Sequence, residues 1–461
     1  MRTLFPGNHR GRSHARPMTE GSILRHLLVY AIPAILGDLF QVTYNTVDSI
    51  IVGKYAGAGA LASVGVASPL MSVAMFFIIG VGIGASVLMS EFYGAGDQSS
   101  LRREFSTTLV MSLGISTAIG MTLFFLASPL LKLVNTPEAI LKDTVRYLRI
   151  VAAGMIATGM YNILAAASRS VGDTRTPLKC MVAGSLINVG LDLWFVGALG
   201  WGVSGAAVAT VISQACSAGL CGLLLRRNEP VFFTADHVGR RFGVDRKLLS
   251  RTVQFSYASA LQQAGIYVGK LLVQSMVNPL GVHAAAAFTA VNRIDDYALI
   301  PQRDIGNGEM VLVAQNHGAR RPDRMLKGLK VALLLEISYS VLISLGVFML
   351  AGPLMRLFVS AEETEVLELG ARYLQLMGLF YILPGIANAL QGYMRAVGRM
   401  KLTMAVTYSQ MFTRALFTFL LIGRLGLDAV PLACVAGWIL MTVWEGGLII
   451  RWKKSGRLIE M

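Results

Sequence analysis

The chain has 461 residues, of which 54% are hydrophobic and only 15% are charged. Soluble domains carry about 25% charged residues, so the composition excludes a series of soluble domains of about 150 residues each. The net charge of +15 does not require a nucleic-acid partner, because Lys and Arg lie in short segments between apolar runs. These features predict an all-α, multi-pass membrane protein.

Twelve segments are long and apolar enough to cross a bilayer, which takes about 20 residues of helix. Their predicted bounds are 23–52, 61–87, 105–127, 139–168, 177–197, 203–225, 250–277, 283–313, 325–351, 364–396, 401–422 and 427–450. The longest connection separates two groups of six helices. The predicted domains are therefore a basic tail (1–22), a first lobe (23–225), a connecting loop (226–249), a second lobe (250–452) and a second tail (453–461).

Lys and Arg are unevenly divided between the two sides of the predicted bilayer. With the first tail inside, 29 of them lie in inside segments and five in outside loops. The positive-inside rule then places both termini in the cytoplasm, in a cell membrane. Residues 1–17 have no apolar run, and we expect either an unstructured tail or a native start at Met18.

The two halves repeat each other. Gly82-Ile83-Gly84 recurs as Gly306-Asn307-Gly308 at an offset of 224, and further matches follow in order while the offset drifts to 226. Each half has six helices, an even number, so the repeats are parallel. Two facing bundles predict a transporter that works by alternating access. The further matches are Gly94-Ala95 with Gly318-Ala319, 128–133 with 352–357, 146–148 with 372–374, Asn162 with Asn388, and 169–172 with 395–398.

Segment 23–52 carries four polar side chains within an arc of about 80° on one helix face. An ionisable group at membrane depth costs at least about 2.5–3.5 kcal/mol, which makes it a functional candidate. The alternative is a polar seam against another helix. The four residues are Asp38, Gln41, Asn45 and Asp48.

Four oxygen-bearing side chains of the first lobe are predicted to lie at one depth, roughly 8–12 Å inside the outer helix ends. Asn188 and Asp192 share a helix face at i, i+4, and Asp48 and Thr210 lie at matching distances from their own helix ends. Oxygen ligands suit a hard cation, and two close carboxylates also favour a shared proton. The alternative is a hydrogen-bonded core cluster.

The second lobe lacks this cluster, since Asp48 aligns with Leu272 and Asp192 with Arg414. Its own polar residues are predicted to line a substrate pathway or to form structural pairs, with Arg414 and Lys270 pairing with Asp295, Asp296 or Glu445. The predicted pathway residues are Asn292, Asp295, Asp296, Gln410 and Arg414.

Seven stretches of the sequence resemble those of one family of transporters: Gln41–Asp48, Gly94–Asp97, Arg169–Asp173, Asn188–Asp192, Val203–Gln214, Gln315–Asn316 and Gly318–Ala319. Together they make the chain similar to the multidrug and toxic compound extrusion (MATE) family over residues 18–455. The resemblance implies twelve helices in two lobes, and export of cationic amphipathic compounds in exchange for Na⁺ or H⁺. It also implies a hinge at Pro33 and a coupling-ion site at Asp48, Asn188, Asp192 and Thr210. One branch of the MATE family also uses acids in its seventh and tenth membrane helices. The corresponding segments here, 250–277 and 364–396, have no acid in the middle.

The predicted function is therefore a secondary antiporter that exports organic cations. The alternative within transport is a lipid-linked or metabolite exporter, for which the positive charges of Lys270 and Arg414 are relevant. A membrane-embedded enzyme is not favoured, because the sequence lacks a metal-ligand cluster or a nucleophile with a nearby base. The expected partners are small molecules and the bilayer, with no nucleic acid or ATPase subunit, no cofactor besides the coupling ion, and a monomeric state.

The predicted topology can be tested by labelling. Single cysteines near positions 56, 136 and 360 should react with an impermeant thiol reagent added to intact cells, whereas those near 98, 236 and 322 should react only after permeabilisation. A cysteine-free chain is the control. Labelling of position 236 from outside would reverse the orientation.

Overall fold

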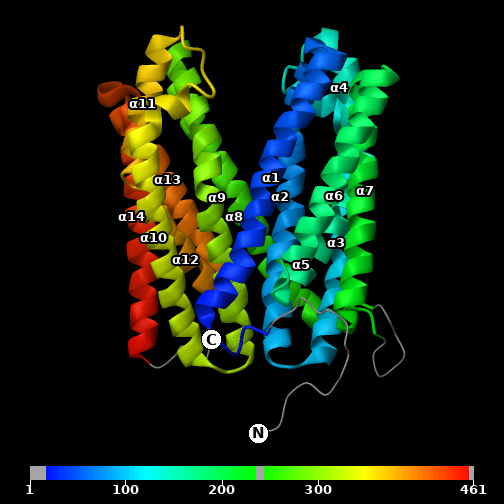
Figure 1. The fold of residues 1–461 in the computed structure, drawn as a ribbon, viewed down its shortest axis with the longest axis vertical. Helices are drawn as coiled ribbons and strands as arrows, with labels where there is room; N and C mark the ends of the chain where they lie inside the picture. The colour runs from blue at the N-terminus through cyan, green and yellow to red at the C-terminus, as the bar shows by residue number, and fades with distance from the viewer. Residues whose placement is uncertain (1–16, 235–242, 456–461) are drawn as a thin grey trace. The chain divides into compact units, whose positions relative to one another are not determined.

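The computed structural model describes residues 17–234 and 243–455. These residues form fourteen α-helices and contain no strand (Figure 1). In a bilayer every backbone N–H and C=O group must be satisfied within the protein, and a helix does so within one segment. The predicted all-α fold is confirmed.

The helix bounds follow the apolar segments closely, apart from two segments that are each broken into a pair. Seven helices cover the first half: α1 (Ile23–Ala56), α2 (Ala58–Gly94), α3 (Gln98–Leu133), α4 (Glu138–Ala153), α5 (Met155–Ser170), α6 (Arg175–Asp192) and α7 (Gly202–Asn228). Seven cover the second half: α8 (Arg246–Val277), α9 (Val282–Gly318), α10 (Pro322–Met355), α11 (Thr364–Gly378), α12 (Ile382–Ala396), α13 (Met400–Leu425) and α14 (Ala429–Lys454).

The fourteen helices are consistent with twelve spans. Helices α4 and α5 form one span bent by 45°, and α11 and α12 form one bent by 49°. In the described residues, seven helical stretches pass a test of length and apolar composition, or nine with the bent pairs, and the stretch Met400–Lys454 holds both α13 and α14. Helices α8 and α9 complete the twelve, although charged and polar residues lower their apolar character.

The break between α4 and α5 lies at Gly154, which the sequence pattern did not reveal. A Cβ atom on Gly154 would lie 2.5 Å from a methyl group of Val211 on α7. Only glycine allows this approach, so packing against α7 fixes where the span bends.

The chain divides into two compact units that differ from a simple cut between the halves. The first contains Ile32–Ala260, and the second contains Met18–Ala31 and the chain from Leu261 onward. Helix α1 therefore begins in the second unit and continues in the first, and the first part of α8 belongs to the first unit.

Each unit contains the same close helix crossing, at the repeat positions that the sequence predicts. In the first unit, a Cβ atom on Gly82 of α2 would lie 3.8 Å from the carbonyl oxygen of Asn162 on α5. In the second, a Cβ atom on Gly306 of α9 would lie 3.1 Å from that of Asn388 on α12. The internal repeat is thus a repeat of packing as well as of sequence.

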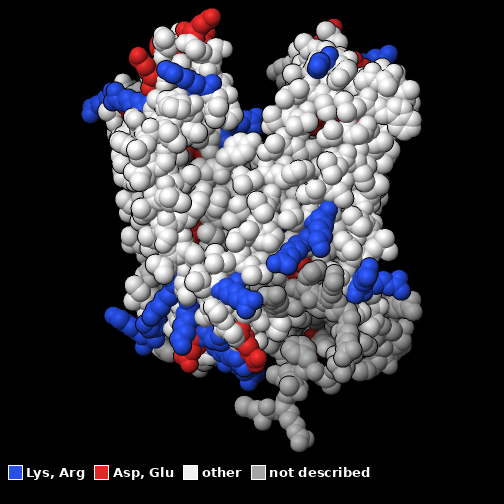
Figure 2. Space-filling model, in the orientation of Figure 1, with Lys and Arg blue, Asp and Glu red and all other residues white. Residues whose placement is uncertain are grey.

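Charged side chains gather at the helix ends of the second unit, around the turn from α9 to α10 and the end of α14 (Figure 2). The face of the second unit above them is almost free of charged atoms in this view. An apolar band bounded by charge is the surface that a bilayer requires.

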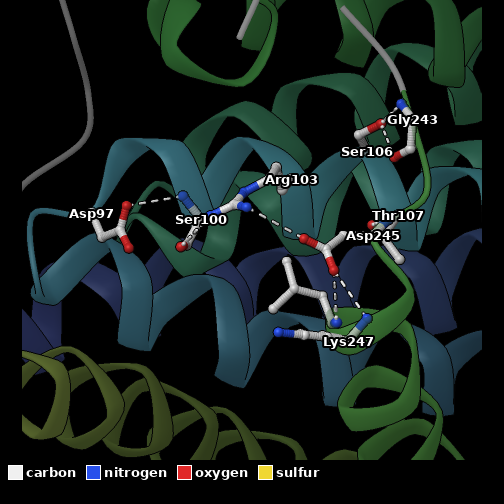
Figure 3. A network of polar contacts seen from close by, with 9 residues as sticks. Asp97, Ser100, Arg103, Ser106, Thr107, Gly243, Asp245 and Lys247 are labelled. Carbon is white, nitrogen blue, oxygen red and sulfur yellow. Dashed lines mark hydrogen bonds and ion pairs between the residues drawn. The ribbon is translucent and has the colours of Figure 1, made fainter. Parts of the chain in front are cut away.

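Polar contacts cap the first turns of α3 and α8 (Figure 3). Asp97 accepts a hydrogen bond from the backbone N–H of Ser100 at 2.9 Å. Partial burial favours a higher pKa for Asp97, but its hydrogen bonds with Ser100 and the charge of Arg103 lower that pKa below its usual value. Asp245 accepts in the same way from the N–H groups at 247 and 248, at 3.0 and 3.3 Å. Both carboxylates satisfy N–H groups that have no partner within their helix.

The residues just before α8 are also tied to α3 (Figure 3). The N–H of Asp245 donates to Thr107 Oγ1 at 3.0 Å, and Ser106 Oγ donates to the carbonyl of Gly243 at 2.9 Å. Arg103 lies 3.4 Å from the Asp245 carboxylate, but this ion pair is partly exposed. Asp245 therefore stabilises this end of the first unit chiefly as a helix cap.

Replacing Asp245 with Ala should lower the stability of the purified protein by about 0.5–2 kcal/mol, because the α8 cap is lost. The control is Arg103→Ala, which removes the exposed ion pair and a hydrogen bond to Ser100 Oγ but leaves the α8 cap intact, and which should cost about 0–1 kcal/mol. Thermal unfolding in detergent measures both. Equal losses would mean that the ion pair, and not the cap, stabilises the start of α8.

Candidate functional site

Two acidic side chains of the first unit face each other. Asp192, the last residue of α6, is fully buried, and Asp48 on α1 is partly buried. Their carboxyl groups lie within hydrogen-bonding reach. The Oδ1 atom of each has no hydrogen-bond partner in the described part of the chain. Two carboxylates at this range repel each other unless a proton or a small cation lies between them.

Asn188 holds the pair in place from one turn earlier on α6. Its amide is fully buried and bonds the hydroxyl of Tyr44 on α1. In the amide orientation that satisfies both ends, Nδ2 donates to Asp192 Oδ2 at 3.0 Å and Oδ1 accepts from the N–H of Thr210 at 3.2 Å. The i, i+4 spacing of Asn188 and Asp192 thus produces the predicted common face.

The hydroxyl of Thr210 forms its hydrogen bond within its own helix. It donates to the carbonyl of Ala206 on its own helix at 2.9 Å, and Thr210 meets Asn188 through its backbone N–H. The predicted group of four residues is brought together, but the contact that the structure shows from α7 is a backbone one.

Two tyrosines at this site were missed by the sequence analysis. Tyr44 lies four residues before Asp48 and therefore on the same face of α1, a spacing that could have identified it. Tyr147 on α4 lies close enough to interact electrostatically with Asp48 and Asp192. Tyr147 belongs to the repeated motif 146–148, which could have identified it. Both bring phenolic hydroxyl groups to the acidic pair.

The helix changes its winding directly after the site. Residues Leu193–Ala198 form a π-helical turn that follows Asp192. Such turns are rare and frequently lie at functional sites, since they release backbone groups from the regular ladder.

The remaining polar residues of α1 are more exposed or have other neighbours. Gln41 and Asn45 are exposed, and no described hydrogen bond joins them to Asn188. Asp38 is partly buried and interacts electrostatically with Tyr161 of α5. Pro33 lies at the start of the α1 segment that belongs to the first unit.

The polar residues of the second unit separate into two groups. Asp295 is buried and accepts a hydrogen bond from the hydroxyl of Tyr381, with the charge of Arg414 nearby. Asp296 is exposed and forms an ion pair with Lys270 at 3.1 Å. This ion pair is one of the predicted pairings.

The other members of the predicted pathway set differ in exposure. Gln410 is buried against Gly437 of α14, and Asn292 is partly buried. Among the described residues, Arg414 forms no ion pair, and its Nε atom has no hydrogen-bond partner.

The family model described as MatE matches residues 33–194 and again 258–420. The chain belongs to the MatE family. The two matches cover one half each, in agreement with the repeated packing. As a MatE protein it is a multi-pass membrane transporter of small molecules, not an enzyme.

Named relatives and a solved structure span most of this MatE chain. It is 27% identical over 390 residues to the probable multidrug resistance protein YpnP of Bacillus subtilis, covering 84% of this chain and 85% of that one. It is 25% identical over 393 residues to the FAD transporter of Shewanella oneidensis, covering 82% and 84%. A crystal structure of MATE in complex with MaL6 matches its fold with a TM-score of 0.88 at 22% identity, covering 95% of this chain and 98% of the other.

The facing carboxyl groups should reduce the stability of the resting MatE protein. Asp192→Asn removes one acidic group and should raise stability in detergent at neutral pH by about 0.5–2 kcal/mol, in thermal unfolding. The control is Asp173→Asn, which should lower stability because Asp173 accepts hydrogen bonds from the N–H and hydroxyl of Thr176 at the start of α6. A loss at Asp192 as large as that at Asp173 would identify Asp192 as a structural cap.

Proposed function

We propose that this transporter is a secondary active antiporter that exports organic, cationic amphipathic compounds in exchange for H⁺ or Na⁺. The observation that carries the proposal is the facing pair of Asp48 and Asp192, whose Oδ1 atoms have no hydrogen-bond partner among the described residues. A buried acidic pair binds a proton or a small cation readily and releases it when its surroundings become hydrated. Transport driven by an ion gradient requires such reversible binding.

Alternating access would follow from movement of helices around the acidic pair. Pro33 removes a backbone hydrogen bond within α1, so the helix can bend on the segment that leads to Asp48. The π-helical turn after Asp192 is a second irregular element beside the site. These features support Pro33 as a hinge and the pair as the coupling-ion site.

The proposed location is the cell membrane, with both termini in the cytoplasm and a monomeric state. The excess of Lys and Arg in the predicted cytoplasmic segments supports the orientation. Several relatives bear names that refer to multidrug resistance, which supports export of toxic organic compounds. The acids of α1, Asp38 and Asp48, would attract cationic compounds.

A second candidate is export of an anionic metabolite. Arg414 carries a fixed positive charge on a repeat position where the first unit has Asp192, and Lys270 lies in the same unit. One relative is named an FAD transporter. Two positive groups in one unit would suit a phosphate-bearing or carboxylate-bearing compound.

The coupling role can be tested in proteoliposomes with separately imposed pH and Na⁺ gradients and a fluorescent organic cation such as ethidium. Asp48→Asn and Asp192→Asn each preserve side-chain shape and remove a charge, so each should reduce gradient-driven transport at least about ten-fold. Protein yield and monodispersity report folding. Transport at the wild-type rate by either variant would contradict the coupling assignment.

The control variant is Arg414→Gln, which alters the second unit and leaves the acidic pair intact. It should keep the same ion dependence while changing the preference between cationic and anionic compounds. A lost ion requirement in Arg414→Gln would place Arg414 in the coupling machinery. Faster transport of FAD than of ethidium by the wild-type protein would favour the second candidate.

A further inference from the structure

A second group of buried acids lies in the second unit, away from the residues that the sequence analysis selected. Asp304 and Glu309 are on α9 and Glu336 is on α10, with exposed fractions of 4%, 0% and 0%. At 1.5 Å per residue, Glu336 lies about 21 Å from the start of α10, and Glu309 about 14 Å from the end of α9. Both positions therefore lie more than two turns inside their helices.

Glu309 and Glu336 receive no hydrogen bond from the residues that the structure describes. All four of their carboxyl oxygens lack a partner there. The charged groups that act on Glu336 are the acids Asp304 and Glu309. The other titratable neighbours are phenols, Tyr339 on α10 beside Glu336 and Tyr393 on α12 beside Glu309. Ionised carboxylates in this setting would be buried without any compensating positive charge.

Each of the two acids is held against a glycine of α12. A Cβ atom on Gly385 would lie 3.4 Å from Glu336 Oε2, and one on Gly392 would lie 3.2 Å from Glu309 Oε2. The latter would also lie 2.7 Å from the carbonyl oxygen of Gly306 on α9. The helices therefore meet closely here, and both carboxyl groups are buried in the crossing.

Gln302 provides an independent indication of a missing hydrogen-bond donor. Its side chain is fully buried, and Nε2 donates to Ser340 Oγ and to the carbonyl of Tyr381, each at 2.9 Å. Its Oε1 atom has no partner among the described residues. Gln302 Nε2 and Glu336 Oε2 lie 3.3 and 3.4 Å from the same point, which is where a Cβ atom on Gly385 would lie. A carboxyl group in this pocket of polar atoms becomes a donor only when it carries a proton.

The first unit shows that the fold does not need these acids. At the offset of 224, Glu309 corresponds to Ala85 and Glu336 to Ser112. The matching crossing is built with hydroxyl groups, since a Cβ atom on Gly159 would lie 1.9 Å from Ser116 Oγ and 3.5 Å from Ser112 Oγ. Small side chains therefore suffice for the packing, and the carboxyl groups of the second unit have another role.

We propose that Glu309 and Glu336 form a proton-binding site of the second unit, separate from the acidic pair Asp48 and Asp192. Each carboxylate takes one proton from water and forms an O–H bond, and it returns that proton to water on ionisation. The described residues include no group of three or more His, Cys, Asp or Glu side chains arranged to hold a metal ion, which favours a proton over a metal ion. Proton binding keeps α12 packed against α9 and α10, and ionisation draws water into the crossing.

The test is infrared spectroscopy of the purified full chain in H₂O and D₂O, without any transported compound. The starting protein carries Asp48→Asn and Asp192→Asn, so the first acidic pair contributes no signal. Its protonated-carboxyl C=O band should decrease as the pH is raised, because ionisation converts each carboxyl group to a carboxylate. Adding Glu309→Gln and Glu336→Gln should remove the share of that band that these two groups contribute, while the other buried acids, Glu104, Asp295 and Glu445, keep theirs. Glu309→Ala with Glu336→Ser, the residues of the first repeat, should do the same in a protein that folds.

The matched control is Glu91→Gln, because the Glu91 carboxylate pairs with Arg251 at 2.8 Å and should not contribute to the band. The proposal is overturned if both pairs of glutamate substitutions leave the size of the titrating band unchanged, or if no protonated-carboxyl band decreases as the pH is raised. A band that decreases on addition of Na⁺ at constant pH would show a cation site instead. The measurement involves no transport, so its outcome is independent of whether Asp48 and Asp192 couple transport.

Discussion

The fold and its chemistry depend on one constraint, the cost of placing a charged or unpaired polar group among apolar helices. At helix ends the protein meets this cost with hydrogen bonds. Asp97, Asp173 and Asp245 each accept backbone N–H bonds, and each stabilises the start of a helix. Four acids that lie deeper in the helices are not satisfied by hydrogen bonds in this way. Asp48, Asp192, Glu309 and Glu336 all keep carboxyl oxygens for which the described residues supply no partner. Such positions are costly to maintain, which is why they point to function.

Duplication explains how the chain could accommodate these costs. The two units share the crossing of Gly82 with Asn162 and of Gly306 with Asn388, so the scaffold is formed twice by the same packing. The acids occupy different repeat positions in the two units. The position of Asp192 in the first unit corresponds to Arg414 in the second, and that of Glu336 in the second corresponds to Ser112 in the first. Each unit keeps the shared packing without the acids of the other unit. The acids are therefore not required for that packing, and their role is chemical.

Much of the fold could be predicted from sequence because apolar length and charge distribution determine which segments cross a bilayer. The bend at Gly154 could not, because it depends on Val211, 57 positions along the chain. At the site, the i, i+4 spacing of Asn188 and Asp192 identified a shared face, but the bond of the Thr210 hydroxyl to its own helix is visible only in three dimensions. Glu309 and Glu336 lie on different helices, and no spacing rule connects them.

Under the proposed coupling role, helix α1 would provide a physical route from a bound ion to movement of the protein. Its first residues belong to the second unit, where Met18 donates its N–H to Gln315 at 2.8 Å and accepts from Arg324 at 3.0 Å. From Ile32 the helix belongs to the first unit and carries Asp48. A change of charge at Asp48 therefore alters the preferred surroundings of a helix whose other end is hydrogen-bonded within the second unit. Because Pro33 lies next to the boundary and lacks a backbone N–H, the helix can bend there without breaking a regular hydrogen bond. Under the proposed coupling role, an ion bound at Asp48 would therefore act on the first residues of the same helix, which belong to the second unit.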